Sequence, residues 1–344
     1  MAKVKRISQT NRSESKIQKR TALIFIVSVC ALFVMMYFNL TVGASHITTK
    51  DFIDYLWTHD QTKQTFLIHN VRMPRMIAAL FIGAALSVAG LLMQAMTRNP
   101  LASPQIFGVN SGASFVIVFI TMLIPGLTPF ATILAFFGAF VGGLTVYLLS
   151  GSTKGITPIK LALAGMAIHL FFTSMTQGII LLNEHATSTV MFWLVGSLST
   201  INWTQILGIL PWLIIAFIGT IMIAKQLTIM ELGEQLATSL GQNVKVVRII
   251  IAILVILLAG TSVSVAGPIG FVGLIVPHIV KYYVHTNYRV MIPLAIIIGA
   301  DLLLLSDVLS RLIAFPFESP VGIVTSFVGA LYFLAITAKG VDRI

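Results

Sequence analysis

Long apolar segments, separated by short polar or basic breaks, make up most of this chain. Each runs for about twenty residues, the length an α-helix needs to cross a bilayer at ~1.5 Å per residue. The pattern predicts an all-α membrane protein with about ten transmembrane helices. The expected spans are 21–43, 75–97, 105–124, 130–150, 160–182, 204–224, 247–266, a segment ending near Tyr283, 290–307 and 320–338.

Composition and charge support this interpretation. Of the 344 residues, 57% are hydrophobic and only 10% are charged, whereas soluble domains carry about 25% charged residues. The net charge of +11 comes from basic residues in the breaks, and 17 of the 22 lysines and arginines fall in segments assigned to the cytoplasm. The positive-inside rule therefore explains the charge without nucleic acid, and it places both termini in the cytoplasm.

The spans define one domain. Residues 1–20 are predicted to be a basic cytoplasmic tail, 21–340 a single transmembrane domain, and 341–344 a second cytoplasmic tail. Residues 44–71 form the longest outside segment, whose amphipathic pattern predicts an interfacial helix. Residues 225–246 form the only long polar break that faces the cytoplasm within the chain. Apolar and acidic residues recur in this break at helical spacing, and we expect Gly241 to end the helix.

Small residues recur four apart in several spans. Such spacing lets two helices approach closely in a membrane. The pairs are Gly108/Gly112, Gly138/Gly142 and Ala85/Ala89.

Candidate chemistry is sparse. The chain has no phosphate-binding G-x-x-x-x-G-K-S/T motif and no histidine, cysteine and carboxylate cluster at metal-ligand spacing. Asp301, Asp307 and His169 lie in apolar segments, where ionisable groups are costly and face protein or water. An ion-coupled secondary transporter would need them as relays. Asp307 also lies four residues before Arg311, a spacing that permits an ion pair within one helix.

Three arginines lie at predicted outside helix ends, where the chain is otherwise poor in positive charge: Arg72, Arg75 and Arg311. Arginine at a membrane surface binds either lipid headgroups or the carboxylates of a partner protein, since the guanidinium fork suits bidentate pairing. The pattern by itself leaves both alternatives open.

Several motifs, in order along about 45–340, resemble the FecCD type of permease, the membrane subunit of ATP-driven importers for ferric siderophores, haem and vitamin B12. The motifs are R-M-P-R at 72–75, Q-A-M-T-R-N-P-L-A-S-P at 94–104, G-V-N-S-G-A at 108–113, F-W-L-V-G-S at 192–197, L-G-E-Q-L-A-T-S-L-G at 232–241, G-P-I-G-F-V-G-L-I-V-P-H-I-V at 267–280, S-D-V-L-S-R at 306–311 and S-P-V-G-I-V-T at 319–325.

The resemblance implies a vitamin B12-permease-like (type II ABC importer) fold in the bacterial cytoplasmic membrane. It implies a second permease subunit, in a homodimer or heterodimer, and two ATPase subunits that carry ATP and Mg. An extracellular substrate-binding protein, lipid-anchored or periplasmic, completes the complex. The chain itself is then neither an enzyme nor the holder of a cofactor or metal.

Residue roles follow from the same resemblance. Arg72, Arg75 and Arg311 match positions that pair with glutamates of the binding protein. The ATPase-coupling helix is carried over to Glu231, Leu232, Glu234, Leu236, Leu240 and Gly241. An inner gate is carried over to Gly151, Ser152, Thr153, Gly155 and Pro158.

We expect a ferric siderophore as substrate, because iron chelates predominate in this family. Haem and cobalamin are the alternatives within the family, and an ion-coupled secondary transporter is the alternative from another class.

Overall fold

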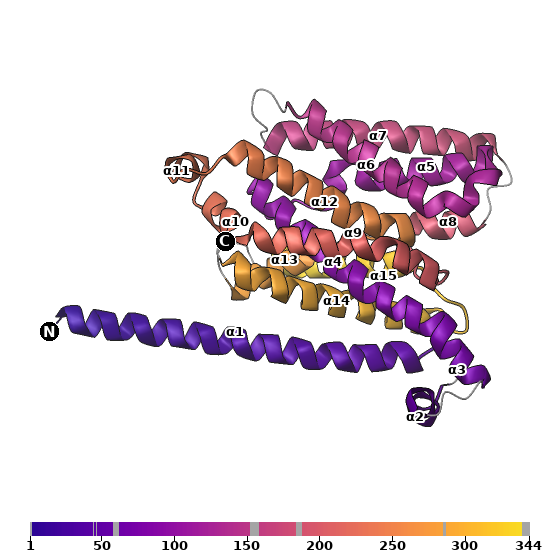
Figure 1. The fold of residues 1–344 in the computed structure, drawn as a ribbon, viewed down its shortest axis with the longest axis horizontal. Coiled ribbons are helices and arrows are strands. Elements are labelled where there is room, and N and C mark those ends of the chain that lie inside the picture. Colours follow the sequence, from indigo (N-terminus) through magenta and orange to yellow (C-terminus); the bar gives the residue numbers. More distant parts are fainter. Residues whose placement is uncertain are drawn as a thin grey trace.

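The structure, a computed structural model, describes residues 2–43, 45, 47–57, 62–151, 158–183, 188–284 and 287–338. Within these residues every regular element is a helix, which confirms the predicted all-α class (Figure 1). The helices are α1 Ala2–Thr41, α2 Thr49–Trp57, α3 Lys63–Leu67, η1 Ile68–Arg72, α4 Met73–Thr97, η2 Pro104–Phe107, α5 Val109–Leu123, η3 Pro125–Phe130, α6 Ala131–Leu149, α7 Pro158–Leu182, α8 Ser188–Val195, α9 Trp203–Met222, α10 Ala224–Glu231, α11 Glu234–Ser239, α12 Val244–Ala266, α13 Val272–Tyr283, α14 Tyr288–Ile313 and α15 Val321–Ala338.

Each predicted span corresponds to one of these helices. In the described part of the chain, seven helical stretches are long and apolar enough to cross a membrane. They contain α1, α4, α6, α7, α9, α12 and α14. The remaining predicted spans correspond to the shorter helices α5, α13 and α15.

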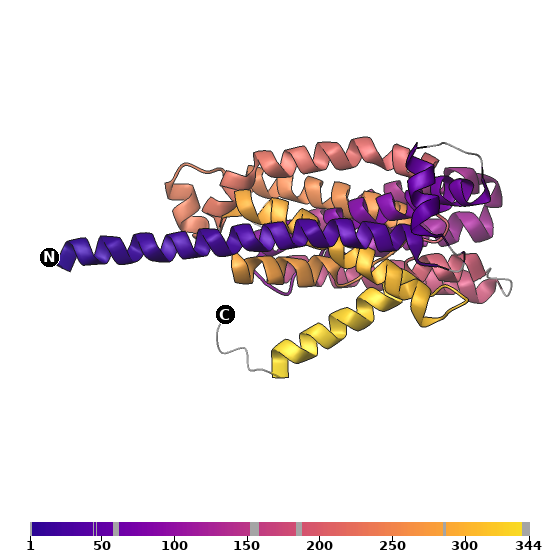
Figure 2. The ribbon, with the colours of Figure 1, turned by 90° about the horizontal axis from the view of Figure 1, so that it is seen from below.

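The two ends of the bundle carry different elements. The start of α1 lies at the same end as α10 and α11, whereas α2 and α3 lie at the opposite end (Figure 1). Helix α1 begins at Ala2, so the expected N-terminal tail is continuous with the first span, and its start projects beyond the bundle (Figure 2).

The segment predicted to be one interfacial helix contains two short helices, α2 and α3. The Thr48 hydroxyl and amide both donate to Asp51 Oδ2, at 2.7 and 2.8 Å, and cap the start of α2. These hydrogen bonds favour the charged carboxylate, and they hold the pKa of Asp51 below its ordinary value.

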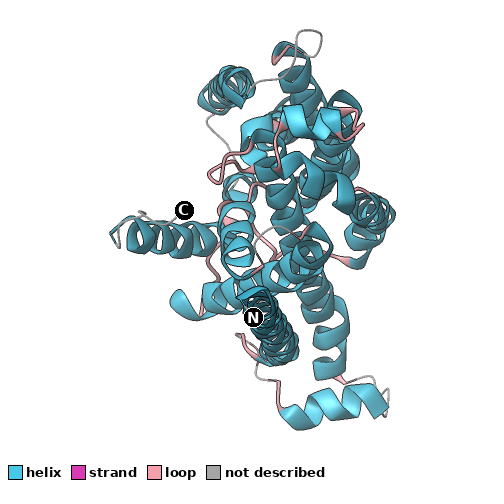
Figure 3. Ribbon diagram, turned by 90° about the vertical axis from the view of Figure 1, so that its left-hand side faces the viewer, coloured by secondary structure: helices cyan, strands magenta, loops and turns pink. Residues whose placement is uncertain are grey.

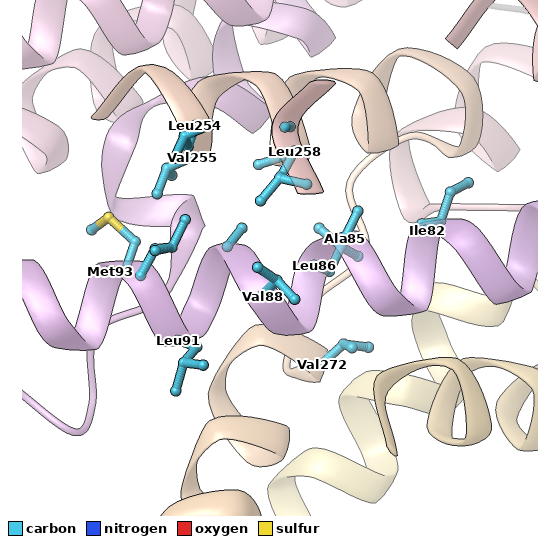
Figure 4. Close-up of a cluster of buried hydrophobic side chains, with 14 of the residues drawn as sticks. Ile82, Ala85, Leu86, Val88, Leu91, Met93, Leu254, Val255, Leu258 and Val272 are labelled. Carbon is cyan, nitrogen blue, oxygen red and sulfur yellow. The ribbon is translucent and has the colours of Figure 1, made fainter. Parts of the chain in front are cut away.

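Helix α4 is the centre of the fold. Its apolar side chains contact α12 on one side and α13 on the other (Figure 4). Ile82, Val88, Leu91 and Met93 are fully buried. Because lipid is as apolar as these side chains, close packing rather than water exclusion holds such helices together within a membrane.

Glycines set the distance between neighbouring helices. A Cβ on Gly90 would lie 1.9 Å from the carbonyl oxygen of Gly273 in α13. Helices α5 and α6 approach in the same way, since a Cβ on Gly112 would lie 2.3 Å from the Gly138 oxygen. The predicted small-residue contacts are therefore confirmed for this helix pair.

Helix α15 leaves the bundle at an angle (Figures 2 and 3). Along it, Phe327, Leu331 and Leu334 are 64%, 52% and 67% exposed. Helix α7 also carries exposed apolar side chains, including Leu163 and Leu170. These faces have no covering neighbour in the described part of the chain.

Candidate functional site

The three predicted arginines meet at the end of the bundle that carries α2. Arg75 Nε donates to Asp307 Oδ1 at 2.8 Å, and Arg311 donates to the other oxygen of the same carboxylate. Arg75 Nη1 also pairs with Glu318, which lies in the segment before α15. We call Arg72, Arg75, Asp307, Arg311 and Glu318 the arginine cluster. The ion pair predicted between Asp307 and Arg311 is confirmed.

Arg72 differs from the other two arginines. It donates to backbone carbonyl oxygens in the last turn of α1 and just after it, including those of Leu40 at 3.2 Å and Ser45 at 2.8 Å, and to Val42 O. Among the described residues, no carboxylate forms an ion pair with it. Arg72 therefore satisfies carbonyl oxygens at the end of the first span. Its positive charge has no ion-paired carboxylate among the described residues.

Arg311 ties α14 to α1. Its Nη1 donates to the Asn39 carbonyl oxygen at 2.8 Å, and its Nη2 donates to Asn39 Oδ1 at 2.8 Å. Asn39 Nδ2 in turn donates to the Leu304 carbonyl oxygen at 3.2 Å. These hydrogen bonds pair the Arg311 guanidinium and the Asn39 amide, which would otherwise be buried between the helices without partners.

The arginine cluster has three guanidiniums and two carboxylates, so its net charge is positive. The arginines are only 3–6% exposed and Asp307 is fully buried, but the Glu318 side chain is 36% exposed. A cavity of about 90 Å³ reaches the cluster, lined in part by Ser45, Arg72, Arg75, Arg311 and Glu318. Docking of a binding protein here stays a prediction.

The predicted coupling helix is two helices. Helix α10 ends at Glu231, Gly233 has a φ of +114°, and α11 starts at Glu234. The expectation of one continuous helix was therefore wrong, because the Gly233 backbone leaves the helical region. Gly241 does end α11: its amide donates to Thr238 O, and the Gln242 amide donates to Ala237 O, a Schellman ending.

The charged residues at this end have partners within the chain. Glu234 makes a bidentate pair with Arg248, at 2.9 and 3.3 Å. Glu231 accepts from the Tyr288 hydroxyl. Three leucines here are also exposed, and we call them the leucine edge: Leu232, Leu236 and Leu240, each 57–64% exposed.

Most of the predicted inner gate lies outside the described residues, namely Ser152, Thr153 and Gly155. Gly151 ends α6 with a φ of +89°, and Pro158 begins α7.

Other ionisable groups have separate environments. Asp301 Oδ1 in α14 is buried and has no hydrogen-bond partner among the described residues. His278 Nδ1 lies 2.8 Å from the Tyr332 hydroxyl, which links α13 to α15. Within the described residues, no three histidine, cysteine or acidic side chains gather as a metal site.

Sequence reasoning missed the two long-range ion pairs of the cluster, Arg75 with Asp307 and Arg75 with Glu318. Asp307 and Arg75 are separated by 232 residues, and Arg75 and Glu318 by 243. Only the unusual carboxylate within an apolar helix signalled that Asp307 needed a cation.

Comparison with known proteins assigns the class. Residues 31–339 match the FecCD transport family. The chain is 45% identical to the Fe(3+)-citrate import system permease protein YfmD of Bacillus subtilis, over 97% of this chain and 98% of that protein. It is 35% identical to the Fe(3+) dicitrate transport system permease protein FecC of Escherichia coli, over 93% and 98%.

A solved structure agrees with the fold. It is described as an inward-facing conformation of a metal-chelate type ABC transporter, and it superimposes with a TM-score of 0.82 at 26% identity, covering 92% of this chain and 99% of that chain. The protein is thus a multi-pass membrane permease, a transport subunit whose ATPase is a separate chain. It belongs to the FecCD transport family.

Proposed function

We propose that the protein imports a ferric siderophore or related iron chelate by alternating access, with ferric citrate as the first candidate. The observation that carries this proposal is the 45% identity to an Fe(3+)-citrate permease along almost the whole of both chains. A hydroxamate permease, FhuB of Bacillus subtilis, is 36% identical over 92% of this chain. Haem and cobalamin remain the alternatives for the test below.

The binding protein would dock at the end that carries α2, which we assign to the outside. The arginine cluster supports this, since its net positive charge and its cavity suit a carboxylate of the partner. Arg72 is the strongest candidate for this contact, because its guanidinium has no ion pair with a carboxylate in the described chain. Arg75 and Arg311 would hold the cluster in place.

The ATPase would bind at the opposite end through the leucine edge. The three exposed leucines form an apolar surface that the ATPase would bury in the assembled complex. The Glu234–Arg248 pair and the Schellman ending make α11 a rigid element that can transmit movement into α12. When the ATPases close, α11 would follow and tilt the helices around the path.

A second permease subunit would cover the exposed apolar faces of α7 and α15. Permeases occur in named pairs among the relatives: FecC and FecD in Escherichia coli, and YfmD and YfmE in Bacillus subtilis. A heterodimer therefore fits this chain at least as well as a homodimer.

The test is ATPase activity of the assembled complex in lipid, with the loaded binding protein. We expect ferric citrate to stimulate hydrolysis several-fold, and haem and cobalamin to leave it at the basal rate. Stimulation by haem or cobalamin alone would overturn the iron-chelate assignment. Absence of stimulation by every ligand would overturn the importer mechanism.

A further inference from the structure

A groove lies between α6 and α9, with residues of η3 and α12 completing its walls. Its volume of about 680 Å³ falls within the ~300–1,000 Å³ of small-molecule sites. We call it the α6–α9 groove. A Cβ on Gly208 of α9 would have nothing within 4 Å, so the groove is open beside that residue. Among the described residues, none in its lining is lysine, arginine, aspartate or glutamate.

The groove begins at the end of the bundle that carries α2 and α3. Asn202, the N-cap of α9, lines it there, and the neighbouring Trp203 indole donates to the His69 carbonyl oxygen in η1 at 2.8 Å. Trp212, which also lines the groove, is the tenth residue of α9 and lies about 14 Å along it at ~1.5 Å per residue. Half of the ~30 Å hydrocarbon core is about 15 Å. The groove therefore spans the depth of one leaflet.

Two aromatic rings line the deep part of the groove. Phe136 of α6 and Trp212 of α9 stack, with ring centroids 6.0 Å apart and an interplanar angle of 28°. The Phe136 ring lies against Gly260 of α12, where an added Cβ would be 3.4 Å from it. Ile133 beside them is 68% exposed, and Trp212 is 48% exposed. Lipid tails are as apolar as these side chains, so this part of the groove suits an acyl chain.

The mouth of the groove is polar but uncharged. The Gln205 backbone amide donates to Asn202 Oδ1 at 3.0 Å, and the Asn202 backbone amide donates to Gln205 Oε1 at 3.2 Å, which forms a capping box. Both side-chain oxygens are therefore used. Within the described chain no hydrogen bond engages Asn202 Nδ2 or Gln205 Nε2, and each of these groups can donate two hydrogen bonds. Such donors suit the phosphate oxygens of a lipid headgroup.

We propose that the α6–α9 groove binds one phospholipid, with an acyl chain against Phe136 and Trp212 and its phosphate oxygens at the Asn202 and Gln205 amides. On the orientation proposed above, this lipid belongs to the outer leaflet. Because the described lining has no fixed charge, the groove does not distinguish phosphatidylethanolamine from phosphatidylglycerol. The described lining also includes no residue of α7 or α15, so a second permease subunit that covers those helices leaves the groove open to lipid.

Tryptophan quenching tests whether the groove is occupied. The assembled complex in detergent is titrated with phosphatidylglycerol brominated along one acyl chain, because bromine quenches a tryptophan that it contacts. We expect saturable quenching at one lipid per copy of this chain. Trp212→Phe keeps an aromatic ring and should remove most of the saturable part. Quenching that rises without saturation, or that is unchanged in Trp212→Phe, would overturn the proposal.

Filling the groove tests where the acyl chain lies. Gly208→Leu adds a side chain whose Cβ has no neighbour within 4 Å, so it extends into the groove and should weaken lipid binding at least tenfold. The matched control is Leu207→Phe at the adjacent position, which is 61% exposed and outside the described lining. It should leave binding unchanged. Equal affinities of the two variants would contradict the location.

Replacing one amide donor tests the headgroup contact. Gln205→Glu keeps an oxygen that accepts from the Asn202 backbone amide, so the capping box remains, but it replaces the donor by a negative charge. We expect the affinity for phosphatidylglycerol to fall at least fivefold, and a brominated diacylglycerol, which has no phosphate, to bind as it does to the wild type. An unchanged phosphatidylglycerol affinity, or an equal loss for the diacylglycerol, would refute the contact.

Two further outcomes decide the nature of the occupant. Phosphatidylethanolamine and phosphatidylglycerol should bind the wild type with affinities within threefold of each other, and a larger preference would contradict an uncharged groove. If a partner subunit covers the groove, the assembled complex shows no saturable quenching, and the proposal fails. These measurements do not depend on the transported substrate, so the iron-import assignment can fail without changing them.

Discussion

Arg75 and Asp307 form a buried ion pair, with Arg75 Nε 2.8 Å from Asp307 Oδ1, and this pair joins the start of α4 to the end of α14. Because Asp307 also accepts from Arg311, one carboxylate holds two cations at 0% exposure. The arginine cluster is thus a structural junction as well as the candidate docking site. Substitutions within it must be chosen so that these two roles are separated.

Replacing Asp307 by asparagine should destabilise the protein strongly. It would leave two buried guanidiniums without their shared counter-ion, and breaking a buried pair in this way costs about 3–5 kcal/mol. Thermal unfolding in detergent measures the effect. The matched control is Asp301→Asn on the same helix, which removes a carboxylate whose buried Oδ1 has no partner in the described chain and should leave stability unchanged or raised. Equal effects of the two substitutions would contradict the cluster geometry.

Replacing Arg72 by glutamate should weaken docking of the binding protein at least tenfold, since it reverses the charge that has no carboxylate ion pair. The dissociation constant at low and high salt is the measurement, and salt should weaken the wild-type interaction. Lys63→Glu, an exposed charge reversal at the start of α3, is the control and should have little effect. Arg311→Glu is a poorer probe, because Arg311 is also bonded to Asn39 and Asp307.

Replacing Glu318 by glutamine should strengthen docking about threefold. Glu318 is the more exposed of the two carboxylates in the arginine cluster, and removing its charge increases the positive potential that a partner meets. The same binding assay measures this, and the gain should disappear at high salt. A loss of affinity would show that Glu318 itself contacts the partner.

Replacing Leu236 and Leu240 by aspartate should release the ATPase during purification, because both side chains belong to the exposed leucine edge. Co-purification of the ATPase measures this. Glu234→Gln is the comparison: Glu234 is paired with Arg248 within the chain, so most of the ATPase should remain bound. Retention of the ATPase in the double aspartate variant would place the coupling contact elsewhere.

Replacing Gly90 by alanine should prevent stable folding, since the added Cβ would lie 1.9 Å from a backbone oxygen of α13. Gly178→Ala in α7 is the matched control, with nothing within 4 Å of its added Cβ. There alanine should be neutral or stabilise the helix by up to about 1 kcal/mol. Yield of folded protein after size-exclusion chromatography distinguishes the two variants, and equal yields would contradict the close helix contact.

Local patterns in the sequence determined much of the fold. The length and spacing of the apolar runs predicted the ten helices, because a bilayer demands about twenty apolar residues for each crossing. Contacts within a turn or two of helix were also readable, including the Asp307–Arg311 pair and the Gly241 helix ending. The break at Gly233 was missed, since helical spacing continues across it and only the backbone conformation reveals it.

The tertiary structure alone decided which distant residues meet. Arg75 meets Asp307 because α4 packs against α14, and Arg72 binds carbonyl oxygens at the end of α1. A cavity of about 440 Å³ likewise combines residues from α5, α7 and the turn after α12. Hydrophobic patterning sets which residues enter the membrane, whereas side-chain packing between helices sets which of them touch. The sequence therefore shows directly which residues enter the membrane. Only the folded chain shows which of those residues touch.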